Sequence, residues 1–134
     1  MVTAVHPDGI YLVAAHGDDD VVALPVLNQG YGEWVRSTPL MSLQVASVAA
    51  ELDPRRNAPV IQLQLVEGLA ATFASVSERN IGNRLAFVVG GMVIVGAHIL
   101  EAILQGRLSI AVGGDIASAT RQAECLRSAR LVQH

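Results

Sequence analysis

Residues 80–114 read NIGNRLAFVVGGMVIVGAHILEAILQGRLSIAVGG, and the way this apolar stretch folds decides the class of protein. Between residues 85 and 104 only His98 and Glu101 are polar, so the stretch is long enough for a membrane helix. We interpret it instead as a β-hairpin, because Gly90-Gly91 suits a two-residue turn between two short strand-like runs. The hairpin predicts a soluble α+β domain, and the membrane-inserted helix is the weaker alternative.

The composition limits the class of protein further. The chain has 134 residues, enough for one domain with a core, and 51% of them are hydrophobic. The net charge is −3 and there is no basic run, so we expect no nucleic-acid partner. Cys125 is the single cysteine, which excludes an internal disulfide, and we expect it to be a small buried residue.

Periodicity predicts the remaining elements. Over residues 59–65 the apolar residues Ile61, Leu63 and Leu65 alternate with glutamines, as in a half-buried strand. We predict strands over 10–15, 21–27, 33–37, 44–52, 60–66, 85–89, 92–95 and 108–112, and helices over 67–80 and from 115 to about 130. Residues 41–52 could also form a helix, but the turn that follows them favours a strand paired with 60–66. These elements describe an α+β sandwich with a mostly antiparallel sheet and two helices.

Several small residues are expected to serve turns and caps rather than chemistry. They are Gly82, Gly90, Gly91, Gly106, Gly113 and Asp115. Gly82 suits the left-handed residue that follows a helix, and Asp115 is a good N-cap. The Gly113-Gly114 pair is not a phosphate loop, because no lysine follows and the Asp115 carboxylate would repel phosphate.

Two runs carry a resemblance to a known family. They are PVIQLQL at residues 59–65 and NIGNRLAFVV at residues 80–89, followed by Gly91-Met92-Val93. In this order and spacing the chain from about residue 38 to 126 resembles the head subdomain of the first periplasmic domain of SecD and SecDF, accessory subunits of the bacterial protein-export translocase. The chain departs from the family pattern at Gly90, where the family has an acidic residue, and at His98, where it has proline.

The resemblance implies a ferredoxin-like two-layer sandwich and a non-enzymatic role in protein interaction. Residues 1–37 would form strands and a Gly-rich loop that pack on a head of residues 38–134, as one compact domain. The implied partners are unfolded polypeptide or a protein of the export machinery, with no cofactor and no catalytic residue. The membrane helices that carry proton transport in SecD are absent from this chain.

Localisation follows from the same resemblance. The first ten residues contain no basic or long apolar segment, so no signal peptide is visible. We expect a periplasmic or extracytoplasmic chain if a signal or anchor lies upstream, with membrane association only through that anchor. Without one, the chain would stay in the cytoplasm.

A small ligand-binding or metal-binding domain, or an enzyme of unknown substrate, is the alternative. His16, Asp18 and Asp20 are the candidate metal ligands, although neighbouring residues of an extended chain point to opposite sides and a solvated turn explains them. His98 could carry a proton near neutral pH, with Glu101 as its nearest acidic residue in the sequence. No nucleophile lies in a recognisable catalytic motif.

Exposed strand edges offer the physical route to protein binding. An extended polypeptide can add to a free edge through main-chain hydrogen bonds, with little demand on its sequence. Tyr31 and Trp34 lie in the Gly-rich segment and would suit an interaction surface if exposed, whereas packing on the core or a sheet edge is the alternative. The same edges would allow a homodimer that pairs strand to strand.

Overall fold

The computed structural model describes residues 7–15, 17–27, 29–55, 57–112 and 114–127. The strands among these residues are β1 Gly9–Leu12, β2 Val21–Pro25, β3 Gly32–Arg36, β4 Met41–Ser42, β5 Val45–Asp53, β6 Ala58–Leu65, β7 Arg84–Val89, β8 Met92–His98 and β9 Arg107–Ala111. The helices are α1 Glu67–Arg79 and α2 Ile116–Arg127. The predicted α+β class, with mostly antiparallel pairing and two helices in the described part of the chain, is confirmed.

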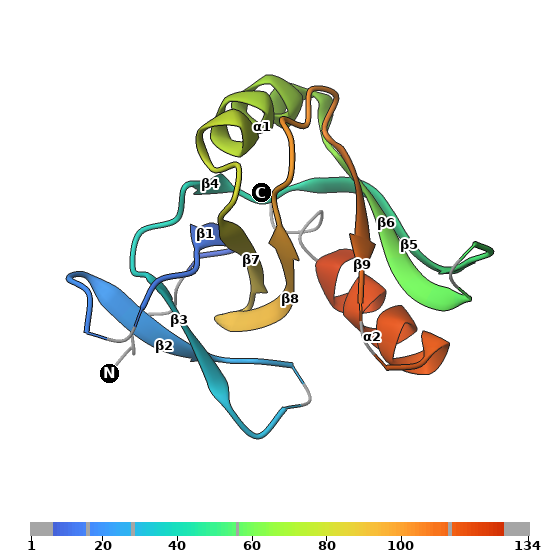
Figure 1. Cartoon of the computed structure of the whole chain (residues 1–134), viewed down its shortest axis with the longest axis horizontal. Coiled ribbons are helices and arrows are strands. Elements are labelled where there is room, and N and C mark those ends of the chain that lie inside the picture. Colours follow the sequence, from blue (N-terminus) through green and yellow to red (C-terminus); the bar gives the residue numbers. More distant parts are fainter. Residues whose placement is uncertain (1–6, 16, 28, 56, 113, 128–134) are drawn as a thin grey trace.

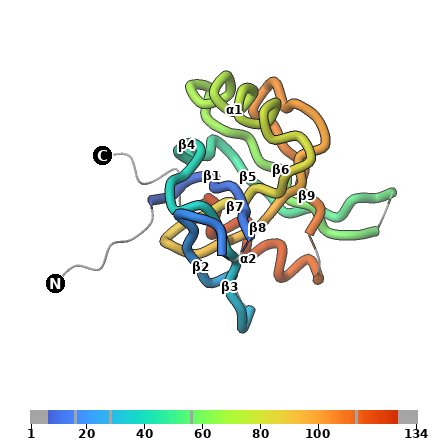
Figure 2. The backbone as a smooth tube through the Cα atoms, turned by 60° about the vertical axis from the view of Figure 1, so that its left-hand side comes forward, coloured from blue at the N-terminus to red at the C-terminus, as the bar shows by residue number. Residues whose placement is uncertain are grey.

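The described strands form three sheets. A four-stranded sheet has the order β4-β1-β7-β8, a three-stranded sheet has the order β5-β6-β9, and β2 pairs with β3 alone. In Figure 1, α1 lies at the top of the molecule and α2 lies against the three-stranded sheet, while the β2–β3 hairpin forms the lower left. Figure 2 shows the same separation of α1 from β2–β3 and the β5–β6 hairpin projecting to the right.

The decisive stretch folds as a hairpin. Gly90 and Gly91 have φ values of 65° and 77°, so both occupy the left-handed region that a tight turn between β7 and β8 requires. Val89 pairs with Met92, and Val88 pairs with Val93. The membrane-inserted alternative is therefore wrong for this stretch. Neither of the two described helices combines the length and hydropathy needed to cross a bilayer.

One hydrophobic core joins the two larger sheets and both helices. Its most deeply buried members include Ile61 and Leu65 of β6, Phe73 of α1, Phe87 of β7 and Leu126 of α2. A second cluster lies on the other face of the four-stranded sheet, where Tyr11, Leu24, Val35, Ala86, Val88 and Val93 are buried together. The β2–β3 hairpin is therefore attached to this sheet by apolar packing.

Some predicted elements differ in detail. The strand predicted over 10–15 ends at Leu12, and the two-residue β4 was not predicted. β1 lies between β4 and β7, so a strand of the N-terminal 37 residues forms part of the four-stranded sheet. Ile116, the first residue of α2, is 39% exposed, whereas Ala119, Ala123 and Leu126 of the same helix are buried. Cys125 is half-buried beside the core rather than fully buried.

Candidate functional site

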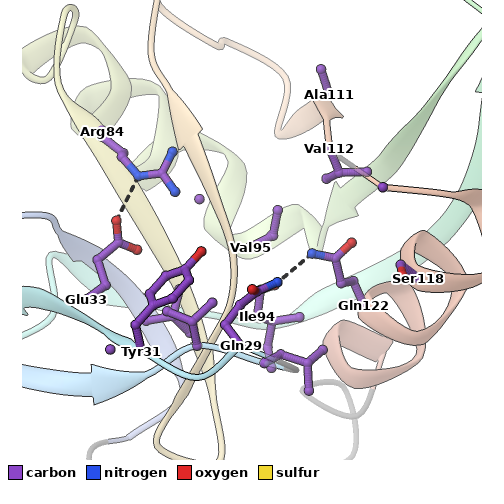
Figure 3. Close-up of a pocket in the computed structure, with 16 residues that line it drawn as sticks. Gln29, Tyr31, Glu33, Arg84, Ile94, Val95, Ala111, Val112, Ser118 and Gln122 are labelled. Carbon is purple, nitrogen blue, oxygen red and sulfur yellow. Dashed lines mark hydrogen bonds and ion pairs between the residues drawn. The ribbon is translucent and has the colours of Figure 1, made fainter.

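A cleft of about 630 Å³ lies beside β8, the edge strand of the four-stranded sheet. Figure 3 shows β8 between two walls, one from the β2–β3 hairpin and the other from β9, α2 and the segment between them. The lining residues from β8 are Val93, Ile94, Val95 and Gly96. The volume is within the range of about 300–1,000 Å³ that is typical of small-molecule sites, so several side chains could enter but a folded domain could not.

The first part of the β8 outer edge is occupied by other parts of the chain. The register of β7 and β8 shifts between Phe87 and Val88, as in a β-bulge. The carbonyl of Val93 accepts a hydrogen bond of 2.9 Å from the Leu27 amide. The next carbonyl, of Ile94, accepts one of 3.1 Å from the side-chain amide of Gln122 on α2. These contacts tie both walls of the cleft to the same strand.

Beyond this bulge the edge is open at Gly96. The carbonyl of Arg84 accepts from the amide of Val13, so the main chain of Arg84 faces away from β8. By the alternation of an antiparallel ladder, Ala86 faces the same way, and its partner Gly96 turns its N–H and C=O outward into the cleft. On that side, the described residues contain one isolated parallel bridge, between Val26 and Val93, and no strand pairs with Gly96. The cleft therefore contains a main-chain donor and a main-chain acceptor ready for an added strand.

An ion pair lies over the same glycine. The Nε atom of Arg84 donates to the Glu33 carboxylate at 2.9 Å, which joins β7 to β3. A Cβ atom added to Gly96 would lie 3.0 Å from Nε and would overlap the rest of the guanidinium group. Only glycine therefore lets Arg84 cross β8 in this orientation. Glu33 and Arg84 are the only charged residues among the described lining of the cleft.

The opposite wall carries an acceptor without a partner. While the Gln122 amide nitrogen bonds to Ile94, its Oε1 atom is buried and makes no hydrogen bond among the described residues. In Figure 3 this side chain points across the cleft toward β8. A buried carbonyl without a donor costs about 1–3 kcal/mol of folding free energy. The Gln122 Oε1 atom is therefore an acceptor that a bound molecule could use.

The start of α2 is held by a capping hydrogen bond. The Asp115 carboxylate accepts from the Ser118 amide at 2.9 Å, and Ser118 lines the cleft. The main-chain and then the side-chain hydrogen bond of Ser118 lower the pKa of Asp115 below its ordinary value. The cap thus fixes the turn of helix from which the second wall is built.

The two aromatic candidates are separated by the structure. Tyr31 lines the mouth of the cleft, and its side chain is 63% exposed. Trp34 is 37% exposed and does not line the cleft. Only Tyr31 is therefore in position to contact a molecule held beside β8.

The candidate metal ligands belong to the turn between β1 and β2. Asp18 accepts from the Ala15 amide at 3.0 Å, and Asp20 has a φ of 55°. His16 lies outside the described residues, as does Gly113. Within the described part of the chain, no group of three or more possible metal ligands gathers. His98 at the end of β8 and Glu101 in the next loop are both exposed.

The sequence did not single out Glu33, Gly96 or Gln122, and it noted Arg84 only as part of a motif. Periodicity can place a residue on a strand, but it cannot show which side chain crosses to another strand. The strand predicted over 92–95 ends just before Gly96, whereas β8 continues to His98. The signal that was available is this glycine, since a glycine inside a strand weakens it unless something approaches it closely.

Comparison with known proteins gives consistent matches. The family model described as SecDF, P1 head subdomain, matches residues 28–132. The protein translocase subunit SecD of Acidaminococcus fermentans is 34% identical over 73 residues, which are 54% of this chain and 18% of that protein. The chain thus spans about a fifth of the length of this curated relative.

Two solved structures have the same fold. SecDF in its super-membrane-facing form gives a TM-score of 0.64 at 22% identity, over 92% of this chain and 19% of that one. A second structure, of a membrane component SecDF that enhances protein export, gives a TM-score of 0.61 at 20% identity, over 95% of this chain and 66% of that one.

Proposed function

We propose that this chain, which belongs to the SecDF P1 head subdomain family, binds an extended segment of unfolded polypeptide along the outer edge of β8. The observation that carries the proposal is the outward-facing main chain of Gly96 inside the cleft. An added strand would hydrogen-bond there without regard to its own sequence, as in other cases of strand addition. Such tolerance suits a protein that handles many different clients.

The walls of the cleft support this mode of binding. The floor and the second wall offer apolar surface from Val95 and Val112, against which client side chains could pack. Tyr31 at the mouth adds a large exposed ring with little conformational entropy to lose. The Leu27 contact to Val93 closes one end of the edge, so a bound segment would be short.

The proposal also covers the place of this chain in protein export. Since one relative is described as a component that enhances protein export, we propose that this chain acts beside an export translocase, in the periplasm, as the head of a longer membrane-anchored protein. The role is in binding and not in catalysis. The ferredoxin-like two-layer sandwich stays a prediction for this head, because the described strands divide into three sheets.

The test fills the cleft. We expect the purified chain to bind a reduced, carboxyamidomethylated polypeptide that cannot refold, measured by calorimetry. Ser118→Trp places an indole in the wall of the cleft, and Thr120→Trp places the same group on the exposed side of α2 as a matched control. The first variant should weaken binding at least about tenfold and the second should not.

Two results would contradict the proposal. One is an unmodified chain that shows no binding to the unfolded polypeptide at high concentration. The other is equal binding by both tryptophan variants, which would move the binding surface away from β8. Melting curves of the two variants would show that each is folded.

A further inference from the structure

The Arg84 side chain is held in one orientation by two neighbours. Glu33 accepts from its Nε atom, and Gly96 leaves the space in which the guanidinium group lies. Figure 3 shows the group reaching from β7 toward β8, with the Glu33 carboxylate bonded to it inside the lining of the cleft. Its side chain is still 38% exposed, so the outer part of the group is accessible.

The two terminal nitrogens of Arg84 make no hydrogen bond among the described residues. Among the described residues only the Glu33 carboxylate receives a hydrogen bond from this guanidinium group, and it does so at Nε. A guanidinium carries five N–H donors in a rigid plane, which leaves four on the terminal nitrogens. The Nη2 atom lies over Gly96, at the position that a Cβ atom would take, so it is on the face of the sheet next to the edge where an added strand would run.

We infer that Arg84, positioned by Glu33 and Gly96, donates to the main-chain carbonyls of the bound segment, and that Glu33 keeps this contact indifferent to the client's charge. The inference rests on the proposed function and deepens it. The acceptor class follows from the charges of the cleft. Because Glu33 neutralises Arg84 and no other charge lines the described cleft, a client carboxylate gains little attraction there.

A neutral pair that still offers donors suits varied clients. Main-chain carbonyls are present in every polypeptide, whereas an unpaired arginine would select acidic segments and repel basic ones. Glu33 is thus a specificity-determining residue through its effect on the charge of Arg84. Without the Glu33 carboxylate, Arg84 should bind client carboxylates in preference to main-chain carbonyls.

The first experiment tests the main-chain contact. A neutral valine-rich hexapeptide with blocked ends is compared with analogues in which each central amide is replaced in turn by an ester, whose carbonyl is a weaker acceptor and which lacks the N–H donor. At least one ester should weaken binding to the unmodified chain about tenfold. Arg84→Gln should weaken binding of the all-amide peptide by a similar factor and should reduce the penalty of that ester.

The second experiment tests the role of Glu33. Glu33→Gln removes the partner charge and keeps Arg84, so a hexapeptide with one glutamate should gain about tenfold over the neutral one at low salt and lose that gain at high salt. A hexapeptide whose only carboxylate is its free C-terminus shows whether Arg84 in this variant binds a chain-end carboxylate or only a side-chain carboxylate. The unmodified chain should discriminate among these peptides by less than about threefold.

A structural role for the pair is excluded by the direction of these changes. If the ion pair only held the β2–β3 hairpin in place, Arg84→Gln and Glu33→Gln would weaken every peptide equally. Gly96→Ala gives a third variant, because the added methyl must displace the guanidinium group while its charge remains. It should weaken the neutral peptide as Arg84→Gln does.

The outcomes separate this inference from the proposed function. Binding by the unmodified chain with no change in Arg84→Gln would overturn the inference and leave cleft binding standing. If Glu33→Gln bound the glutamate-containing and the neutral hexapeptides equally well, the proposed role of Glu33 in masking the charge of Arg84 would be overturned, and cleft binding would again stand. No binding of the unfolded polypeptide or of any peptide to the unmodified chain would overturn both.

Discussion

The outer edges of β8 and β5 are built differently, although each borders one of the two larger sheets. The β8 edge has a glycine at its open position and faces a cleft whose described charges cancel. The β5 edge has an acceptor covered by α2, since Arg127 donates to the carbonyl of Val48 at 2.8 Å. β5 also begins with a register shift and ends near Asp53, and irregularity and charge both discourage pairing with another strand.

This difference between the β5 and β8 edges indicates which of the two could pair with an added strand. A long edge strand is a hazard unless it is blocked, and β5, with nine residues, is blocked in several ways. The β8 edge is instead enclosed by the walls of the cleft, where we propose that an extended chain binds. A homodimer formed by pairing of edges stays a prediction, and β5 is where a loss of protection would produce it.

The largest expected effect comes from removing the support of β8. Phe87 of β7 is fully buried and pairs with Val95 of β8. Phe87→Ala should lower the free energy of unfolding by about 3–5 kcal/mol, because the cavity and the lost burial add together. Leu52→Ala on β5, where the side chain is 52% exposed, is the control and should change it by less than about 0.5 kcal/mol. Denaturant unfolding measures both, and comparable losses would show that the two strands contribute equally to the core.

A smaller effect is expected from the connection between β8 and β9. The buried Ser77 hydroxyl on α1 accepts from the Ile103 amide at 2.8 Å and donates to the Ala74 carbonyl. Ser77→Ala leaves that amide without its acceptor, so the loss in unfolding free energy should be about 1–3 kcal/mol. Ser75→Ala on the exposed side of α1 is the matched control. We also expect faster hydrogen exchange over residues 99–106 in Ser77→Ala, with exchange in β5 unchanged.

Much of the fold was readable from the sequence. Gly90-Gly91 between two apolar runs predicts a hairpin because few other residues accept positive φ at two successive positions. The alternation in β6 likewise predicts a strand that faces a core. β4 was not predicted because a strand of two residues is too short to show an alternation of apolar and polar residues. It is a strand only because it pairs with β1.

The candidate site was less readable, for a physical reason. It depends on contacts between residues that lie far apart in the sequence, such as Glu33 with Arg84 and Gln122 with Ile94. Local periodicity contains no information on such pairs. Tyr31 could be proposed from its residue type and its Gly-rich surroundings, but its place at the cleft depends on how β2–β3 packs on the sheet.

Unblocking the β5 edge should change association more than stability. Arg127→Ala exposes the carbonyl of Val48 and removes a positive charge, so we expect a rise in self-association at high protein concentration. The free energy of unfolding should fall by no more than about 1 kcal/mol. Arg121→Ala, on the same helix and exposed, is the control. Sedimentation measures the association, and a monomer at all concentrations would mean that other features protect β5.

The smallest effect should be a pH dependence confined to one end of α2, the helix that serves both edges. Hydrogen bonds from Ser118 lower the pKa of Asp115, so its ionised form favours the folded state. That contribution is complete above the ordinary pKa of the group and is lost as the pH falls through the lower folded-state value. Asp115→Asn keeps a capping oxygen and cannot titrate, which makes it the matched control.

The position of this cap distinguishes the two edges once more. As the pH falls, protection against hydrogen exchange, relative to the intrinsic rate at each pH, should fall first in the turn of α2 that holds Ser118, beside the cleft, and Asp115→Asn should lack this change. Arg127 lies at the opposite end of the same helix, so its contact with β5 should persist to lower pH. An equal loss of protection at both ends would mean that α2 opens as one unit, and the two edges would then respond to acid together.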